Sequence, residues 1–159
     1  MELLEGFTLE TLVARFGPVP PERAVHLLCQ VCHSLAEAHH AGLVHRDIRP
    51  ANIFACRRGL DLDFVKVLDF GLVKDRKESG AGLTIAGTMA GTPGYMPPEA
   101  ALGNREIDAR AGIYALGCVA YWLLTGRPVF EGTRAMEVVL DHVRTAPVPA
   151  FAALGAVLP

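Results

Sequence analysis

The sequence predicts a mainly α-helical domain with one small β-hairpin, that is, an α+β fold in which helices dominate. Over most of the chain, apolar residues recur every three or four positions, which is the spacing of one face of a helix. Only residues 53–56 and 64–68 have the length and the side chains typical of short strands. With 159 residues, 51% of them hydrophobic, the chain has the length of one domain and enough apolar side chains for a core.

The composition and charge of the chain argue against several classes of protein. A net charge of -2 provides no basic surface of the kind that nucleic-acid binding needs, so no nucleic-acid partner is expected. Glu2 and Glu5 stand where a signal peptide would be basic, and the longest uncharged helical run, 111–126, is shorter than the roughly 18 residues of a membrane span. Four cysteines without secretory features favour free thiols. We therefore expect a cytoplasmic chain without a membrane segment; whether a full-length protein is anchored stays open.

Two helices are expected before the hairpin. Thr8 can cap the first, which ends at Gly17 and has one apolar face: Leu9, Leu12, Val13 and Phe16. The second begins at Pro20-Pro21-Glu22, since proline and an acid suit a first turn, and it ends at Gly42. Its predicted buried face is Val25, Leu28, Cys29, Cys32, Leu35 and Ala36.

The second helix contains Cys29-Gln30-Val31-Cys32-His33, which matches the C-x-x-C-H pattern of covalent haem attachment. A haem or metal protein is therefore one alternative. Both sulfurs fall on the predicted apolar stripe, however, and free cysteine behaves as a small hydrophobic residue in cores. We interpret the two cysteines as core residues.

The hairpin is predicted from Ile53–Cys56 and Phe64–Leu68, which are joined by a turn at Arg57-Arg58-Gly59. Such a hairpin brings its two ends together. Asp47 and Asn52 precede the first strand and Asp69 follows the second, so two carboxylates and an amide oxygen are expected to converge. Oxygen ligands of this kind suit a hard cation, and a carboxylate can also act as a base.

The second half of the chain is predicted to contain a long polar segment and two helices. Residues 73–90 are rich in glycine and hydroxyl groups and too long for an ordinary connection, so the segment is either functional or a disordered surface loop. Residues 108–125 are apolar on every side, which predicts a helix buried all round, stopped at Gly126. One more amphipathic helix is marked by Met136, Val139, Leu140 and Val143.

Four motifs in this order resemble a eukaryotic-type protein kinase of the bacterial Ser/Thr class. They are His45-Arg46-Asp47 with Asn52 five residues after the aspartate, Asp69-Phe70-Gly71, Gly91-Thr92-Pro93-Gly94-Tyr95, and Pro97-Pro98-Glu99. The resemblance covers nearly the whole chain, 1–159, but only the middle of a kinase domain. It implies the hinge, the helical C-terminal lobe and the hairpin of the catalytic loops, with the N-terminal lobe absent and both ends truncated.

The resemblance implies phosphoryl transfer from ATP to Ser or Thr hydroxyls of a protein substrate, with Mg²⁺ as the cofactor ion. Asp47 would orient the hydroxyl and accept its proton, Arg49 would neutralise the transferring phosphate, and Asn52 and Asp69 would hold magnesium. The remaining roles are ATP binding by Glu2, Leu4 and Phe54, regulation through a phosphate on Thr84 or Thr88 paired with Arg46, and a substrate platform at Thr92.

Three departures from the family pattern leave a second interpretation of the function open. Gly112 stands where the family has a buried aspartate that anchors the catalytic loop, and Arg49 replaces the usual lysine. No glycine-rich phosphate loop and no V-A-I-K-like strand occur in the sequence. The alternative is therefore a pseudokinase or kinase remnant that acts as a protein-binding module, and the isolated chain is expected to be inactive.

Overall fold

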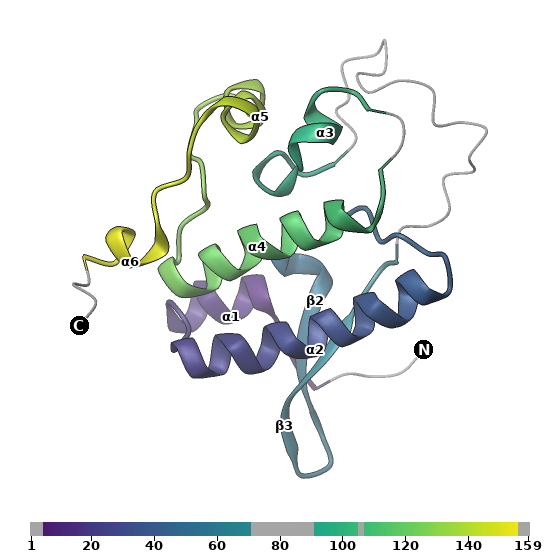
Figure 1. Ribbon diagram of the computed structural model, residues 1–159. Coiled ribbons are helices and arrows are strands. Elements are labelled where there is room, and N and C mark those ends of the chain that lie inside the picture. The colour runs from purple at the N-terminus through teal and green to yellow at the C-terminus, as the bar shows by residue number, and fades with distance from the viewer. Residues whose placement is uncertain (1–4, 71–90, 105–106, 156–159) are drawn as a thin grey trace.

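Helices make up most of the described part of the chain, as the sequence predicts, and a small antiparallel sheet lies beside them (Figure 1). The structure is a computed structural model that describes residues 5–70, 91–104 and 107–155. Its longer elements are α1 (Leu9–Phe16), α2 (Pro21–His40), β2 (Ile53–Arg58), β3 (Asp61–Val67), α4 (Ala109–Thr125) and α5 (Ala135–Arg144). The short ones are β1 (Gly6–Thr8), η1 (Pro50–Asn52), η2 (Pro93–Tyr95), α3 (Pro98–Ala101) and α6 (Ala150–Ala153).

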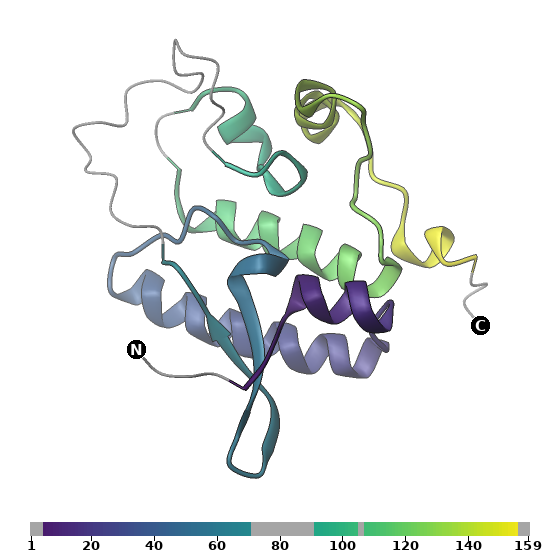
Figure 2. The same cartoon turned by 180° about the vertical axis from the view of Figure 1, so that it is seen from behind.

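The predicted hairpin is present and is longer than expected. β2 and β3 pair antiparallel from Ile53 opposite Val67 to Arg58 opposite Asp61, so Arg57 and Arg58 extend the strand and the turn follows them. A third strand, β1, adds to the other edge of β2 and gives the order β1-β2-β3. We did not predict β1, because three residues are too few for a strand pattern. Figure 2 shows the hairpin tip projecting away from the helices.

Local sequence signals place the helix ends correctly. The Thr8 side chain accepts a hydrogen bond from the Thr11 amide (3.1 Å), and Asp108 accepts one from the Arg110 amide (2.9 Å). Gly126 ends α4 in a left-handed conformation (φ 70°), where its amide donates to the Trp122 carbonyl. These contacts join residues only two to four positions apart, so a short stretch of sequence is enough to predict them.

The buried face of α2 differs from the prediction. The residues that face the core are Ala24, Leu27, Val31, Leu35 and Ala38. Val25 is 59% exposed, and Cys29, Cys32 and Ala36 are exposed as well, so the two cysteines are surface residues and the predicted stripe was wrong except at Leu35 and, in part, Leu28. Two apolar stripes run side by side on this helix, and packing against α4 and β3 selects one of them.

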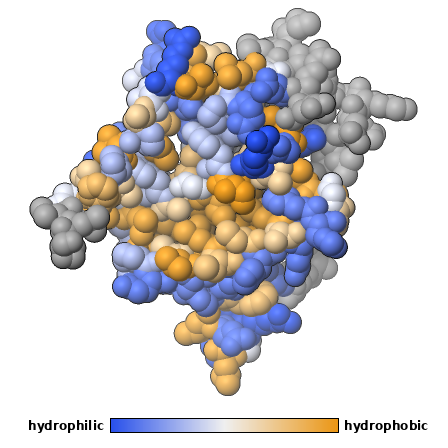
Figure 3. Space-filling view, in the orientation of Figure 1, coloured by the Kyte–Doolittle hydropathy of each residue, from blue (hydrophilic) through white to orange (hydrophobic). Residues whose placement is uncertain are grey.

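The central helix α4 is buried on one side only. Leu116, Val119 and Leu123 lie in the core, whereas Ile113 is 55% exposed and Gly117 is also exposed, so the prediction of burial all round was wrong. Figure 3 shows apolar residues gathered on the face of the molecule where α2 and α4 lie side by side. Phe16, predicted to be buried, is also exposed and contacts the Phe7 ring edge-on. No helix in the described ranges is long and apolar enough to cross a membrane.

Candidate catalytic site

The candidate site is built on the loop that joins α2 to β2. After α2 ends, the chain runs without regular structure to the short helix η1, which leads directly into β2. Ile48 and Pro50 are buried and fix the loop to the core. Asp47 lies next to the buried Ile48 but keeps 41% of its side chain exposed. The loop therefore holds a carboxylate at the surface on a fixed main chain.

His45 connects this loop to the end of β3. Its side chain is 1% exposed, Nε2 lies 2.9 Å from the Leu68 carbonyl oxygen, and the Asp47 amide donates to Nδ1 (3.3 Å). A carbonyl can only accept, so Nε2 carries the hydrogen and Nδ1 is the acceptor of a neutral imidazole. The ring also packs 4.7 Å from the Phe70 ring. His45 thus positions the main chain at Asp47 and at Leu68, just before Asp69.

Asn52 and Asp47 are in direct contact. The Asn52 side-chain amide donates to both the carbonyl oxygen (2.8 Å) and the carboxylate oxygen Oδ2 (2.9 Å) of Asp47. Asn52 is only 7% exposed, so its side of the contact is shielded from water, whereas the Asp47 carboxylate stays accessible. Both amide hydrogens are used, which leaves the Asn52 side-chain oxygen as its acceptor for another group. The predicted convergence of these two residues is thus visible in the geometry.

Two further groups reach the Asp47 carboxylate. The Thr92 hydroxyl donates to Oδ1 (3.4 Å) from a position 45 residues later in the chain. Arg49 places Nε 3.5 Å from Oδ2, close enough for an ion pair although the geometry is not that of a hydrogen bond. Since 38% of the Arg49 side chain is exposed, this pair contributes little to stability.

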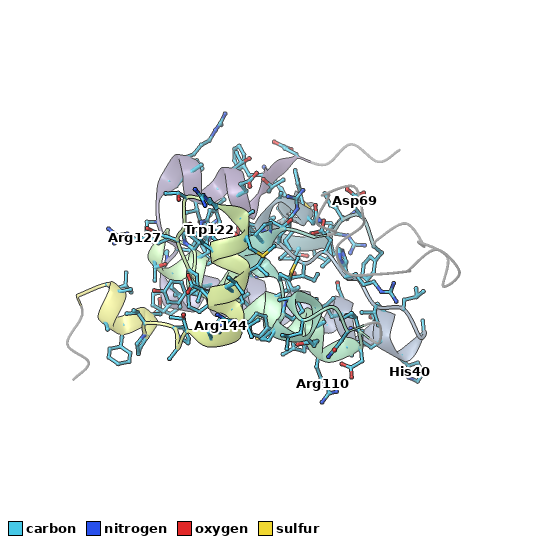
Figure 4. The ribbon with its side chains drawn as sticks, turned by 90° about the horizontal axis from the view of Figure 1, so that it is seen from above. His40, Asp69, Arg110, Trp122, Arg127 and Arg144 are labelled. Atoms are coloured by element: carbon cyan, nitrogen blue, oxygen red, sulfur yellow. The ribbon has the colours of Figure 1, made fainter. Side chains whose placement is uncertain are left out.

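Asp69 lies one residue beyond the point at which β3 is fastened to the loop. The Leu68 amide donates to the Asn52 carbonyl (2.8 Å), which joins the two segments directly before Asp69. Asp69 itself is exposed and has a left-handed main chain (φ 52°). Figure 4 shows it on the sheet side of the molecule, apart from Arg110 and Arg144 on the helices. Within the described ranges no three His, Cys, Asp or Glu residues form a metal site, so a shared cation at Asn52 and Asp69 stays a prediction.

The other predicted residues are only partly visible. Phe54 is half-buried in the middle of the sheet, between Thr8 on β1 and Lys66 on β3. Arg46 is exposed and left-handed (φ 62°), and its side chain makes no hydrogen bond or ion pair to another described residue. Glu2, Leu4, Thr84 and Thr88 lie outside the described residues.

Comparison with known proteins agrees with this geometry. A family model described as a protein kinase domain matches residues 1–151. The chain belongs to the protein kinase family. The resemblance to bacterial Ser/Thr kinases is confirmed by "Serine/threonine-protein kinase PknB" of Mycolicibacterium smegmatis, which is 40% identical over 149 residues, 94% of this chain and 23% of the relative. "Serine/threonine-protein kinase pkn3" of Myxococcus xanthus is 41% identical over 151 residues, 94% of this chain and 27% of the relative.

A solved kinase structure has the same fold. The crystal structure of Rad53 in complex with AMP-PNP matches with a TM-score of 0.74 and 26% identity, covering 98% of this chain and 36% of the Rad53 chain. This kinase chain spans about a quarter of the length of the two Ser/Thr kinase relatives named above. Its fold and family are shown, whereas the activity of a whole protein is a proposal.

Sequence reasoning missed several residues that hold this kinase lobe together. Gln30 was treated only as part of the C-x-x-C-H pattern, but its side chain donates to the Asp63 carbonyl (2.8 Å) and accepts from the Val65 amide (3.0 Å). His142 was not considered, although it is 5% exposed and lies 2.8 Å from the Tyr114 hydroxyl. The sequence offered one signal for such residues, namely a polar side chain within an otherwise apolar face of a helix. That signal does not identify the residue to which the side chain bonds.

Proposed function

We propose that this chain forms the catalytic-loop half of a protein kinase that transfers phosphate from ATP to Ser or Thr hydroxyls of a protein substrate. The observation that carries the proposal is the Asp47 carboxylate, held by Asn52 and Thr92 on a loop fixed by His45. A carboxylate that is exposed, oriented and hydrogen-bonded can align a substrate hydroxyl and accept its proton. The cytoplasmic location expected from the sequence stays a prediction.

Arg49 and Thr92 complete the surroundings of the proposed base. The Arg49 guanidinium lies beside the carboxylate and is always charged, so it can neutralise a phosphate that approaches Asp47. Thr92 fixes the second carboxylate oxygen, which restricts rotation of the side chain. Both residues act by orientation and charge, which are the main protein contributions to phosphoryl transfer.

The residues present fit a magnesium ion. The Asn52 side-chain oxygen accepts no hydrogen bond from another described residue, and Asp69 offers an exposed carboxylate. Oxygen ligands from an amide and a carboxylate are those that magnesium takes. When bound with ATP, the ion would neutralise phosphate charge. Phe54 is proposed to support the adenine ring, and Arg46 to pair with a regulatory phosphate.

A pseudokinase or remnant that acts as a binding module is the second candidate, and one observation favours it. Gly112 is buried in α4, where the family pattern has an aspartate, and Nε2 of the neighbouring His39 is buried without a hydrogen-bond partner among the described residues. A polar atom left unpaired in the interior weakens the packing of α2 against α4. The catalytic loop follows α2 directly, so its rigidity depends on that packing.

A chimera separates the two candidates. Residues 1–151 would replace the matching segment of the Mycolicibacterium smegmatis relative, and transfer from labelled ATP to a generic basic protein would be measured. The kinase proposal expects transfer that falls by about 10²–10⁴ in Asp47→Asn. A folded chimera that transfers nothing, with or without Gly112→Asp, would overturn the proposal in favour of the binding module. If only the Gly112→Asp chimera transfers phosphate, Gly112 is the residue that abolishes activity.

A further inference from the structure

Two free thiols lie on the outer face of α2. Cys29 and Cys32 are exposed, whereas the other two cysteines of the chain, Cys56 and Cys118, are buried. The opposite face of α2 packs against β3 and α4 (Figure 1), so the backbone that carries the two exposed thiols is held in place. The proposed kinase function uses neither thiol. Both are open to a ligand from solution.

The two exposed cysteines share one turn of the helix. Residues three or four positions apart in an α-helix lie on the same face, with Cβ atoms about 5–6 Å apart, so Cys29 and Cys32 are neighbours. A disulfide needs Cβ atoms about 3.5–4.5 Å apart. A disulfide between these two residues would therefore distort α2. The pair is better suited to remain as two thiols that reach a common ligand.

A metal ion between the two sulfurs fits this spacing. Zinc–sulfur bonds are about 2.3 Å long, so an ion of similar size holds two sulfurs up to about 4.6 Å apart. Each sulfur lies one bond from its Cβ atom, and both side chains can change rotamer on the exposed face. Rotation about the Cα–Cβ bonds can bring the sulfurs to that separation while the helix keeps its shape.

The number of protein ligands limits the kind of ion. In the described parts of the chain, no three His, Cys, Asp or Glu side chains are grouped so that they could hold a metal ion. Zinc takes four ligands in structural sites, so two thiolates leave half of its positions to water. Cu(I) is a soft ion that prefers thiolate ligands and forms stable complexes with only two of them. The pair therefore favours a soft cation over zinc.

We propose that Cys29 and Cys32 form a two-thiolate binding site for a soft monovalent cation, represented by Cu(I). On binding, each thiol releases its proton to the buffer and each sulfur forms one bond to the ion, so the complex carries one negative charge. No electron is transferred. The site does not depend on the proposed kinase function.

Competition for Cu(I) tests the site in the whole 159-residue chain. Cu(I) is titrated without oxygen into a mixture of the chain and a coloured Cu(I) chelator, and we expect tight uptake of one ion per chain. In Cys29→Ser and in Cys32→Ser the second thiolate must come from another molecule. The apparent affinity should then fall by about 10², the ratio of an effective concentration on the order of 1 mM to a chain concentration of about 10 μM. Removal of a buried thiol, in Cys56→Ala or Cys118→Ala, should leave the uptake unchanged.

Variants with the same number of thiols test whether the spacing matters. In Cys32→Ser with His33→Cys, the new thiol lies four residues from Cys29, so tight uptake should return. In Cys32→Ser with Ala36→Cys, the second thiol lies seven residues away, about 10.5 Å along the helix axis, so uptake should stay weak. All of these positions are exposed, so the substitutions should leave the fold unchanged, which circular dichroism checks.

Three results would overturn the proposal. The first is uptake by the unaltered chain that is no tighter than uptake by Cys29→Ser. The second is tight uptake by the Ala36→Cys variant, which would show that the spacing of the thiols plays no part. The third is displacement of Cu(I) by an about tenfold excess of zinc, because it would mean that further ligands complete a four-coordinate site. The chimera measures phosphate transfer, so failure of the kinase proposal would leave these binding results standing.

Discussion

Two residues that are not glycine have a left-handed main chain on either side of the candidate site. They are Arg46 (φ 62°), next to Asp47, and Asp69 (φ 52°). This conformation costs an ordinary residue roughly 1–2 kcal/mol, so neighbouring contacts must hold it. His45 provides them, because its ring bonds to Leu68 and contacts Phe70 on one side and receives the Asp47 amide on the other. The loop geometry is maintained by a buried imidazole.

The glycine at position 112 can be tested by Gly112→Asp. A Cβ added there would lie 4.0 Å from both Nε2 of His39 and Cδ1 of Leu35, an ordinary contact distance, so the site has not closed around glycine. The new carboxylate would approach the unpaired His39 nitrogen, and a glycine inside a helix would be removed. We expect the free energy of unfolding to rise by roughly 1–3 kcal/mol, less the desolvation of the carboxylate.

Denaturant melts with equal slopes measure this change. Gly112→Ala is the matched control, because it supplies the helix propensity of about 1 kcal/mol without the carboxylate. An aspartate variant less stable than the alanine variant would show that the position rejects a charge. That result would strengthen the binding-module candidate.

At the scale of elements, helix α2 protects the open edge of the sheet. β3 is an edge strand, and unpaired edges invite pairing with other chains. Gln30 bonds to the main chain of Asp63 and Val65, and Arg23 makes two 2.7 Å contacts to the Asp63 carboxylate. The Arg23 hydrogen bonds lower the pKa of Asp63 in the folded state. The pair therefore stabilises the fold above about pH 4, and this stabilisation is lost as the pH falls further.

Removal of this attachment should loosen the hairpin. We expect Gln30→Ala to lower the free energy of unfolding by about 1–3 kcal/mol, since it leaves a main-chain donor and a main-chain acceptor without their partner. Gln30→Glu keeps the acceptor for Val65 but places an oxygen against the Asp63 carbonyl, so it should also destabilise. A glutamate variant as stable as the original would contradict the assigned roles of the two atoms. Thermal or denaturant melts decide this.

At the scale of the whole molecule, large apolar side chains remain in contact with water. Leu60 is 93%, Leu62 72%, Val25 59% and Ile113 55% exposed. Large apolar side chains exposed in this way favour association. We expect the 159-residue chain to melt below about 65 °C and to aggregate, as measured by calorimetry and sedimentation. Ile113→Gln should reduce aggregation with little change in melting temperature. Val119→Ala, by contrast, removes apolar contacts in the core and should lower the melting temperature. A monomer that melts well above that temperature would contradict the prediction.

The same chain, tested by itself, should transfer no measurable phosphate. Its sequence contains neither a glycine-rich phosphate loop nor the lysine that accompanies it in the family pattern. Loss of one preorganised charge-stabilising group typically lowers a rate by about 10²–10³, and several are involved here. Incubation of the pure chain with labelled ATP and a basic protein tests this. Transfer that disappears in Asp47→Asn would show that the prediction is wrong.

The sequence by itself determined the features that depend on neighbouring residues. Thr8, Asp108 and Gly126 define helix ends through contacts with residues two to four positions away. Asp47 and Asn52 are five residues apart on one short loop, so their contact follows from the local path of the chain. The kinase motifs are recognisable for the same reason, because each is a short continuous stretch.

Only the tertiary structure decided how these stretches meet. The contact of Thr92 with Asp47 joins positions 45 residues apart, and that of Tyr114 with His142 joins positions 28 apart. On α2, one of two apolar stripes became the core face, which left Cys29 and Cys32 at the surface. The periodicity of a helix states that a face is apolar, but the burial of that face depends on which other elements pack against it, and no local pattern contains that information.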